Sequence, residues 1–213
     1  MGYKAFATMN IAIIGNEKMT SVLAQGLALA GHEVFIGIKE NQSILLDFLA
    51  AEFDNLSVVT IEEAATIADI IIMATVPEDV REAAYLLDDV RKKVIIDLSF
   101  MNFSRTGNYL NTLNAIKAIT GSLYIVKGFS ASGFELAACP VKDDSEINMF
   151  IVGDSKKAKE MVKLLARDLG YASCHDFGGS ESVALLDEMA ICHHHLSHGQ
   201  QRGEKISIRI LKN

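Results

Sequence analysis

The spacing of apolar residues in the first half of the chain alternates between two periods. Residues 10–15 (NIAIIG) form an almost continuous apolar run, which is typical of a strand buried on both faces. Between residues 18 and 30 the apolar positions recur at helical spacing, so that Met19 and Leu27 share one helical face. Gly31 follows, where a left-handed residue would close this helix. The pattern predicts a buried strand followed by an amphipathic helix.

The same alternation continues to about residue 100. Strands alternate with short helices across connections of a few residues, which indicates right-handed crossovers and a parallel sheet covered on both faces. The expected fold class is therefore α/β, with a doubly wound, mostly parallel sheet. The predicted strands are 33–38, 56–60, 69–76 and 92–99, and the predicted helices are 43–53, 61–68 and 77–87, the last with Pro77 near its first turn.

The second half of the chain is less regular, and no linker, repeat or low-complexity tract divides it from the first. We therefore predict a single domain over residues 1–213, with a core of about 9–128 and a C-terminal strand–helix extension of about 129–213 that packs on the core. The predicted elements are a helix at 111–120, strands at 122–130 and 147–154, an amphipathic helix capped by Ser155 and closed by Gly170, and a long helix from about Glu181 towards His198.

Composition and charge exclude several classes of function. Half of the 213 residues are hydrophobic and 22% are charged, which is an ordinary globular composition. The formal net charge of −7 provides no basic surface for nucleic acid, and the longest apolar runs are too short for a membrane span. No signal peptide is expected, because the N-terminal decapeptide lacks an apolar stretch. The three cysteines (Cys139, Cys174 and Cys192) make no disulfide framework, so we predict a reducing, cytoplasmic location.

Open parallel sheets bind ligands beyond the carboxyl ends of their strands. In this sequence that rule points to a loop (Gly15–Thr20) with an incomplete dinucleotide fingerprint. The fingerprint requires glycine at positions 15, 17 and 20, whereas this chain has Gly15, Glu17 and Thr20. Glu17 brings negative charge towards a phosphate, while Lys18 and the free N–H groups of the following helix favour an anion. The residues alone leave open whether the loop binds a dinucleotide or the chain retains only the fold.

The end of the second predicted strand gives a mixed signal about the cofactor. NAD sites usually carry an acidic residue there for the ribose 2′-hydroxyl, and NADP sites favour a basic one for the 2′-phosphate. The strand ends in the sequence IGIKE, so Lys39 suits NADP and Glu40 suits NAD. Both residues could equally be solvated at the start of a loop.

The order of segments resembles that of the F420-dependent NADP oxidoreductases, a family that includes the reductase domains of STEAP-type metalloreductases. The similar segments are MNIAIIG with the helix ending AGHEV, ATVPEDV, IVKGFSASGFELAACP, FIVGDSKKAKEMVKLLARDLGY and FGGSESVALLDEMA. The resemblance covers about residues 9–200 in order. It implies a Rossmann fold, binding of NADP (with NAD as the second possibility), and hydride transfer between the nicotinamide and a second redox partner. That partner would be a deazaflavin, a flavin or another small molecule.

The resemblance also implies roles for individual residues. Hydride transfer between stacked rings needs orientation more than acid–base chemistry, so no catalytic side chain is named. The expected cofactor-binding residues are Gly15, Asn16, Glu17, Lys18 and Met19 at the pyrophosphate, Ile38, Lys39 and Glu40 at the ribose, and Thr75, Val76 and Pro77 along the strand ends. The rule for strand ends, and not the resemblance, adds Ser99, although a residue in that place more often caps the next turn. Ser130, Ala131 and Ser132 are expected beside the nicotinamide and the second substrate.

Other interpretations of the sequence remain open at this stage. The chain could be a non-catalytic descendant of the fold that binds a nucleotide weakly or serves as an interaction module. His194 and His198 have a spacing that suits metal ligands, but a polar stripe on the last helix explains them as well, and we predict no metal site. Cys174 and His175 are neighbours on a predicted strand and should point to opposite faces. We expect a homodimer formed through the C-terminal helices.

Overall fold

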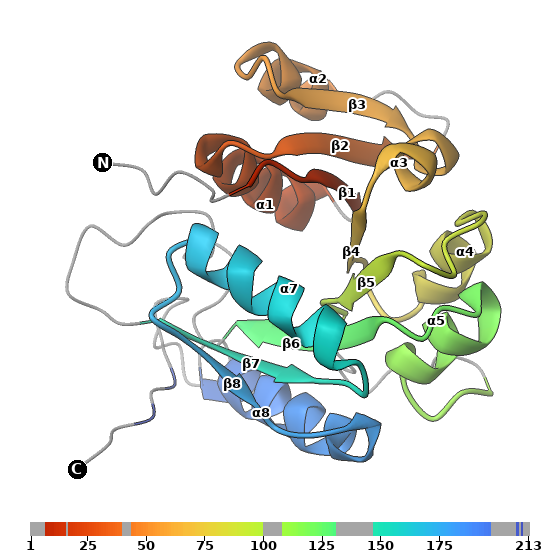
Figure 1. Ribbon diagram of the computed structural model, residues 1–213, viewed down its shortest axis with the longest axis vertical. Helices are drawn as coiled ribbons and strands as arrows, with labels where there is room; N and C mark the ends of the chain where they lie inside the picture. Colours follow the sequence, from red (N-terminus) through yellow and green to blue (C-terminus); the bar gives the residue numbers. More distant parts are fainter. Residues whose placement is uncertain are drawn as a thin grey trace.

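The strands of the protein form one sheet (Figure 1). From β1 the chain adds strands first towards one edge of the sheet, up to β3, and then from β4 towards the other edge. The computed structural model describes residues 7–15, 17–39, 44–99, 108–130, 147–196, 208 and 210. Within these residues the sheet has eight strands in the order β3-β2-β1-β4-β5-β6-β7-β8. Strands β1 to β6 are parallel, β7 is antiparallel to β6, and β8 is parallel to β7. The predicted fold class, a doubly wound and mostly parallel sheet, is confirmed.

The first half of the chain forms the parallel strands and their crossover helices. These elements are β1 (Asn10–Gly15), α1 (Glu17–Ala30), β2 (Glu33–Ile38), α2 (Ile44–Ala51), β3 (Leu56–Thr60), α3 (Ile61–Ile67), β4 (Ile70–Ala74), α4 (Val80–Tyr85) and β5 (Val94–Asp97). The second half adds α5 (Thr112–Thr120), β6 (Ile125–Ser130), β7 (Asn148–Val152), α7 (Lys156–Asp168), β8 (Ser173–Asp176), a short 3-10 turn (Ser180–Ser182) and α8 (Val183–His194).

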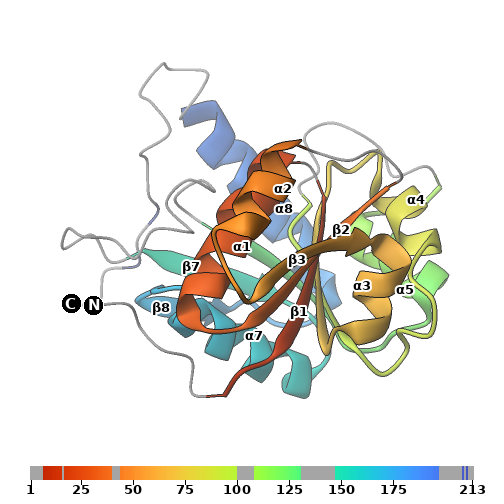
Figure 2. The same ribbon diagram turned by 90° about the horizontal axis from the view of Figure 1, so that it is seen from above.

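Helices cover both faces of the sheet (Figure 2). Side-chain alternation along the strands divides the core into two layers, one on each face. In β1, Ala12 and Ile14 pack towards α3, α4, α5 and α8, whereas Ile11 and Ile13 pack towards α1, α2 and α7. All four side chains are buried, and burying a large aliphatic side chain stabilises the fold by about 1.5–3 kcal/mol. A strand buried on both faces has no polar position, which explains the unbroken apolar run in the sequence.

Local signals in the sequence set the ends of several helices as predicted. The Ser155 hydroxyl accepts a hydrogen bond from the Ala158 N–H at the start of α7. Gly31 and Gly170, with φ of +94° and +87°, close α1 and α7 in the left-handed conformation that glycine adopts without strain. Among the described helices, none is both long and apolar enough to cross a membrane.

Two predicted helix boundaries differ from those observed. Pro77 lies in a turn before α4 and not inside it, because the Asp79 N–H bonds back to the Val76 carbonyl and α4 begins only at Val80. The last helix was expected from about Glu181, but this segment first makes a 3-10 turn, and α8 runs over Val183–His194. His198 lies outside the described residues.

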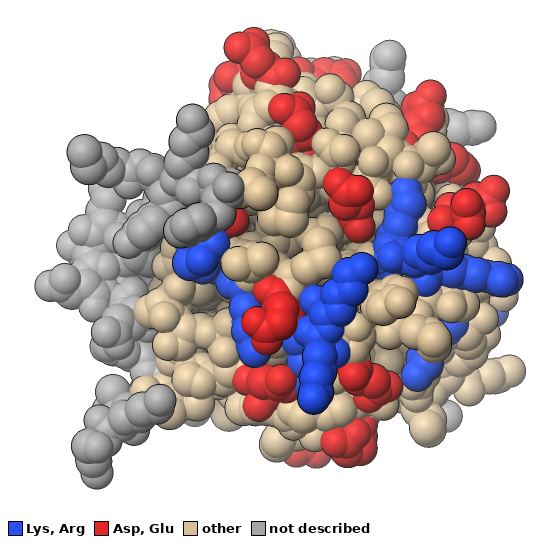
Figure 3. All heavy atoms as spheres, viewed as in Figure 1, with Lys and Arg blue, Asp and Glu red and all other residues tan. Residues whose placement is uncertain are grey.

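Although the net charge is −7, basic side chains are concentrated on one face of the protein. Lys and Arg side chains gather on the face that carries α7 (Figure 3), whose sequence is KKAKEMVKLLARD. Lys159 is the buried lysine of this helix, and its Nζ lies 2.7 Å from Asp176 Oδ1 and 2.6 Å from the Gly178 carbonyl oxygen. It therefore ties α7 to the end of β8.

Candidate functional site

The candidate site is the carboxyl edge of the parallel strands. Gly15 ends β1 and is the register partner of Ala74, which ends β4. The chain leaves these two strands towards opposite faces, so the switch point of the sheet lies between them, where ligands of such folds bind. The structure thus brings Gly15, Ile38, Thr75 and Ser99 to one edge. Whether they contact a ligand there remains a prediction.

Gly15 is required by the packing of β1 against β4, independently of any ligand. A Cβ atom at this position would lie 2.1 Å from the Ala74 carbonyl oxygen and 2.4 Å from its carbon. Both are backbone atoms, so no rotation of a side chain could relieve the contact. The glycine that the loop retains therefore has a structural reason to be there, and by itself it is weak evidence for a phosphate.

The first turn of α1 presents a mixture of exposed and buried groups. Lys18 is exposed and Met19 is half-buried, while Thr20 is buried and its hydroxyl oxygen has no hydrogen-bond partner. Asn16 and the side chain of Glu17 lie outside the described residues, so the predicted repulsion between Glu17 and a pyrophosphate remains untested. The Thr20 hydroxyl oxygen is thus a buried polar atom without a hydrogen-bond partner among the protein atoms.

We expect Thr20→Val to raise the free energy of unfolding of the ligand-free protein by about 1 kcal/mol. The exchange keeps the branched shape and removes a buried hydroxyl whose lack of a partner costs about 1–3 kcal/mol. Urea denaturation followed by circular dichroism measures the effect. Thr112→Val is the matched control, because the Thr112 hydroxyl is also buried but is hydrogen-bonded, so its removal should destabilise. A loss of stability in Thr20→Val would contradict the prediction.

Thr75 and Ser99 join the ends of β4 and β5. Their hydroxyl oxygens lie 3.0 Å apart and both residues are buried, while the Ser99 N–H donates to Asp97 Oδ1 at 2.9 Å. Asp97 therefore shapes the turn after β5. Of the predicted cofactor-lining residues at this edge, Val76 is 43% exposed and offers apolar surface, whereas Pro77 is buried.

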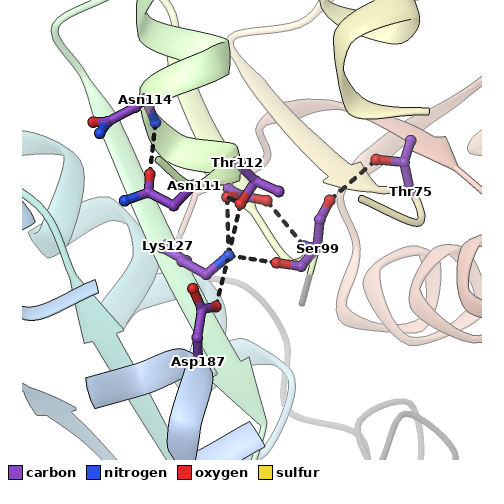
Figure 4. A network of polar contacts seen from close by, with 8 residues as sticks. Thr75, Ser99, Asn111, Thr112, Asn114, Lys127 and Asp187 are labelled. Atoms are coloured by element: carbon purple, nitrogen blue, oxygen red, sulfur yellow. Dashed lines mark hydrogen bonds and ion pairs between the residues drawn. The ribbon is translucent and has the colours of Figure 1, made fainter. Parts of the chain in front are cut away.

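A buried lysine beneath this edge organises a polar network (Figure 4). Lys127 on β6 is fully buried, and its Nζ lies 3.3 Å from Asp97 Oδ2 and 3.3 Å from Asp187 Oδ1 of α8. It also donates to the Thr112 hydroxyl at 2.7 Å and to the Ser99 carbonyl oxygen. The ammonium group thus connects β5, α5, β6 and α8 immediately behind the Thr75–Ser99 pair.

Sequence reasoning did not identify Lys127 as part of the site. The available signal was a single lysine inside the apolar run IVKGF, at a position where a strand buried on both faces excludes an unpaired charge. A second signal was Asp97, an acidic residue directly after the apolar run VII. The sequence does not indicate that these two residues pair with each other, because they are thirty positions apart.

Lys39, the residue predicted to hold a 2′-phosphate, already has an acidic partner. Its Nζ lies 2.7 Å from Glu82 Oε2 in the first turn of α4, and the two side chains are 47% and 66% exposed. Ile38 beside it is half-buried, and Glu40 lies outside the described residues. An exposed pair of this kind is weak and exchanges readily with other ions.

A buried histidine–aspartate contact lies away from the candidate site. His32, in the turn before β2, is fully buried, and its Nε2 lies 3.6 Å from Asp168 Oδ2 at the end of α7. Burial lowers the pKa of His32 below its ordinary value of 6.5, and this outweighs the opposite effect of Asp168. The imidazole is therefore neutral in the folded protein at neutral pH.

The lowered pKa of His32 should make the fold less stable as the solution is acidified. The unfolded chain binds a proton near pH 6.5 and the folded chain does not, so stability falls below that pH, with a slope of at most about 1.4 kcal/mol per pH unit. We expect His32→Gln to lose this component of the pH dependence. Denaturation at pH values between about 7.5 and 5 tests it, with the exposed His195→Gln as control. Parallel pH profiles for wild type and His32→Gln would contradict it.

Cys174 and His175, neighbours on β8, do not form a reactive pair. Burial raises the pKa of the Cys174 thiol to about 12, which makes it a poor nucleophile. The ring of His175 stacks on Phe150 at 5.4 Å in one core layer, and Cys174 packs against the other, so the prediction of opposite faces is confirmed. In the part of the chain that the structure describes, no group of three or more His, Cys, Asp or Glu residues could hold a metal ion.

Residues 10–100 match the model of a protein family described as NADP oxidoreductase, coenzyme F420-dependent. The match confirms, over those residues, the family resemblance seen in the sequence. The matched segment contains β1 to β5, which lie on both sides of the switch point, and the loop at Gly15. A comparison with curated proteins finds no match.

Solved structures share the fold over nearly the whole chain. A "putative f420 dependent nadp-reductase" from Arthrobacter sp. FB24 is 19% identical, with a TM-score of 0.84 over 96% of this chain and 100% of that one. A hypothetical protein from Sinorhizobium meliloti is 20% identical, with a TM-score of 0.69 over 97% of each chain. A pyrroline carboxylate reductase from Plasmodium falciparum with NADP bound is 15% identical, with a TM-score of 0.58 over 88% of this chain and 65% of that one.

Proposed function

We propose, from the family match over residues 10–100, that this protein is an NADP-linked oxidoreductase that transfers a hydride between the nicotinamide and a second redox partner. The second partner would be a deazaflavin, a flavin or another small molecule. The observation that carries the proposal is that the switch point between β1 and β4 lies beside the N-terminus of α1, which begins at Glu17. Both features belong to the segment that matches the family.

The residues at the edge fit such a cofactor. The backbone N–H groups at the start of α1, with Lys18, would hold the pyrophosphate. Lys39 would lie near the adenosine ribose, and the exposed Val76 would contact the cofactor along the strand ends. The bound nicotinamide would supply the hydride.

The side chains at this edge suit positioning more than proton transfer. The hydroxyls of Thr75 and Ser99 are 3.0 Å from each other and buried, so each has its partner within the protein. The protein's contribution would be to orient the cofactor and exclude water from it. Ser130 ends β6, while its side chain and the residues Ala131 and Ser132 lie outside those described, so their placement beside the second substrate remains a prediction.

The rival proposal is a non-catalytic protein of the same fold that binds a nucleotide weakly or serves as an interaction module. The substitutions at two of the three fingerprint positions favour it. Glu17 replaces the glycine that allows a close approach to the pyrophosphate, and Thr20 replaces the glycine that allows close packing of the helix on the strand. The homodimer, the small-molecule partner and the cytoplasmic location expected from the sequence likewise remain proposals.

Titration of the purified protein with NADPH and with NADH, followed by nicotinamide fluorescence, separates the two proposals. An oxidoreductase should saturate with at least one dinucleotide below about 1 mM, the upper end of ordinary KM values. The bound, reduced cofactor should then be oxidised when flavin or deazaflavin is added, which absorbance of the reduced nicotinamide detects. Absence of saturation with either dinucleotide would contradict the enzyme and favour the rival.

A further inference from the structure

We infer that Glu82 weakens the selectivity of the dinucleotide site for NADP over NAD by neutralising Lys39. This inference rests on the proposed function. It makes Glu82, a residue outside the loop and the strand ends, a determinant of cofactor choice. It also predicts that the wild-type protein accepts both dinucleotides, with NADPH bound less than about tenfold more tightly than NADH.

The ion pair joins elements on opposite sides of β1. Lys39 directly follows β2 and Glu82 belongs to α4, which follows β4, while β2 and β4 are the two neighbours of β1 in the sheet. The distance of 2.7 Å between Lys39 Nζ and Glu82 Oε2 therefore places a carboxylate next to the basic group at the ribose end of the site.

The surroundings of Glu82 offer it no closer cation along its own helix. The neighbouring Arg81 lies over the ring of Tyr109, with its guanidinium carbon 6.0 Å from the ring centre. Glu78 and Asp79, which precede α4, are exposed and also acidic. The start of α4 thus adds negative charge to this edge of the site, and Lys39 is the cation that the structure places against Glu82.

The two cofactors respond differently to this arrangement. A 2′-phosphate carries a charge of roughly −1.5 to −2 and must displace the Glu82 carboxylate from Lys39 or share the ammonium with it. The 2′-hydroxyl of NAD has no charge to compensate. Exchanging the Glu82 carboxylate for a phosphate at an exposed lysine gains little binding free energy. We therefore expect NADPH to bind less than about tenfold more tightly than NADH. A lysine without an acidic partner would discriminate by roughly ten- to a hundredfold.

The test is a set of dissociation constants for NADPH and NADH with four proteins: wild type, Glu82→Gln, Lys39→Gln and the double variant. We expect Glu82→Gln to tighten NADPH binding about five- to tenfold and to change NADH binding by less than about twofold. In the Lys39→Gln background the same substitution should change NADPH binding by about twofold or less, because the two residues are coupled.

The matched control is Glu160→Gln on α7. Glu160 Oε1 pairs with Lys163 Nζ at 2.8 Å, and its side chain is 69% exposed, so the variant removes the same charge from a similar ion pair on another surface. It should change the affinity for neither dinucleotide by more than about twofold. If Glu82→Gln and Glu160→Gln tighten NADPH binding equally, the change in net charge explains the effect and the inference is overturned.

The binding measurements separate an error about Glu82 from an error about the proposed function. If wild type binds a dinucleotide and Glu82→Gln leaves the ratio of the two dissociation constants unchanged, the role of Glu82 is wrong and the proposed function stands. If wild type binds neither NADPH nor NADH, the proposed function is wrong and the role of Glu82 falls with it.

Discussion

Replacing Lys127 by methionine is expected to lower the free energy of unfolding by about 3–5 kcal/mol, the cost of removing one partner of a buried ion pair. The lysine ammonium lies 3.3 Å from carboxylate oxygens of both Asp97 and Asp187, and its side chain is fully buried. Methionine fills a similar volume without the charge, so the two carboxylates would remain buried without their cation. Urea denaturation followed by circular dichroism measures the loss.

A control and a partial rescue make this prediction specific. Lys163→Met removes a lysine whose partner, Glu160, is exposed, and it should cost less than about 1 kcal/mol. Adding Asp97→Asn to Lys127→Met removes one of the uncompensated charges and should restore part of the lost stability. If Lys127→Met is as stable as wild type, Lys127 cannot be held in the network that Figure 4 shows.

The second large effect is expected for Gly15→Ala, which should destabilise the ligand-free protein by at least about 2 kcal/mol. The added Cβ would lie 2.1 Å from the Ala74 carbonyl oxygen, so β1 and β4 must move apart at the centre of the sheet. The comparison is made without nucleotide, so that a lost ligand contact cannot account for the result. Thermal or urea unfolding provides the measurement.

A second substitution shows whether the contact is with backbone. Ala74→Gly removes the side chain of the opposing residue but leaves its carbonyl oxygen in place, so the double variant should be no more stable than Gly15→Ala. Rescue by Ala74→Gly would mean that the clash involves the Ala74 side chain. Wild-type stability of Gly15→Ala would mean that the end of β1 does not lie against Ala74 as described.

Much of the fold follows from local patterns because its elements are stabilised locally. The apolar run in β1 specifies burial on both faces, and the Ser155 side chain caps the helix that it precedes. Each of these features depends on residues within a few positions of one another. The main local error, placing Pro77 inside α4, arose because a proline suits both the first turn of a helix and the turn before it.

The candidate site could be predicted as a location but not as a set of contacts. The ends of β1, β2, β4 and β5 must meet at one edge of a parallel sheet, and this placed Gly15, Lys39, Thr75 and Ser99 together before any contact was known. The partners of these residues could not be predicted in the same way. Lys39 is paired with Glu82, more than forty positions away, and Thr75 with Ser99, which follows the next strand of the sheet.

The sequence by itself determined the order of strands and helices, the parallel sheet and the edge at which a ligand would bind. These properties arise from the periodicity of apolar residues and from short-range caps and turns, which operate within a few positions of the chain. The tertiary structure alone decided which groups neutralise each charge. Lys127 is buried only because residues from β5, α5 and α8 converge on it, and the free energy of a buried charge depends on those neighbours and not on its own sequence context.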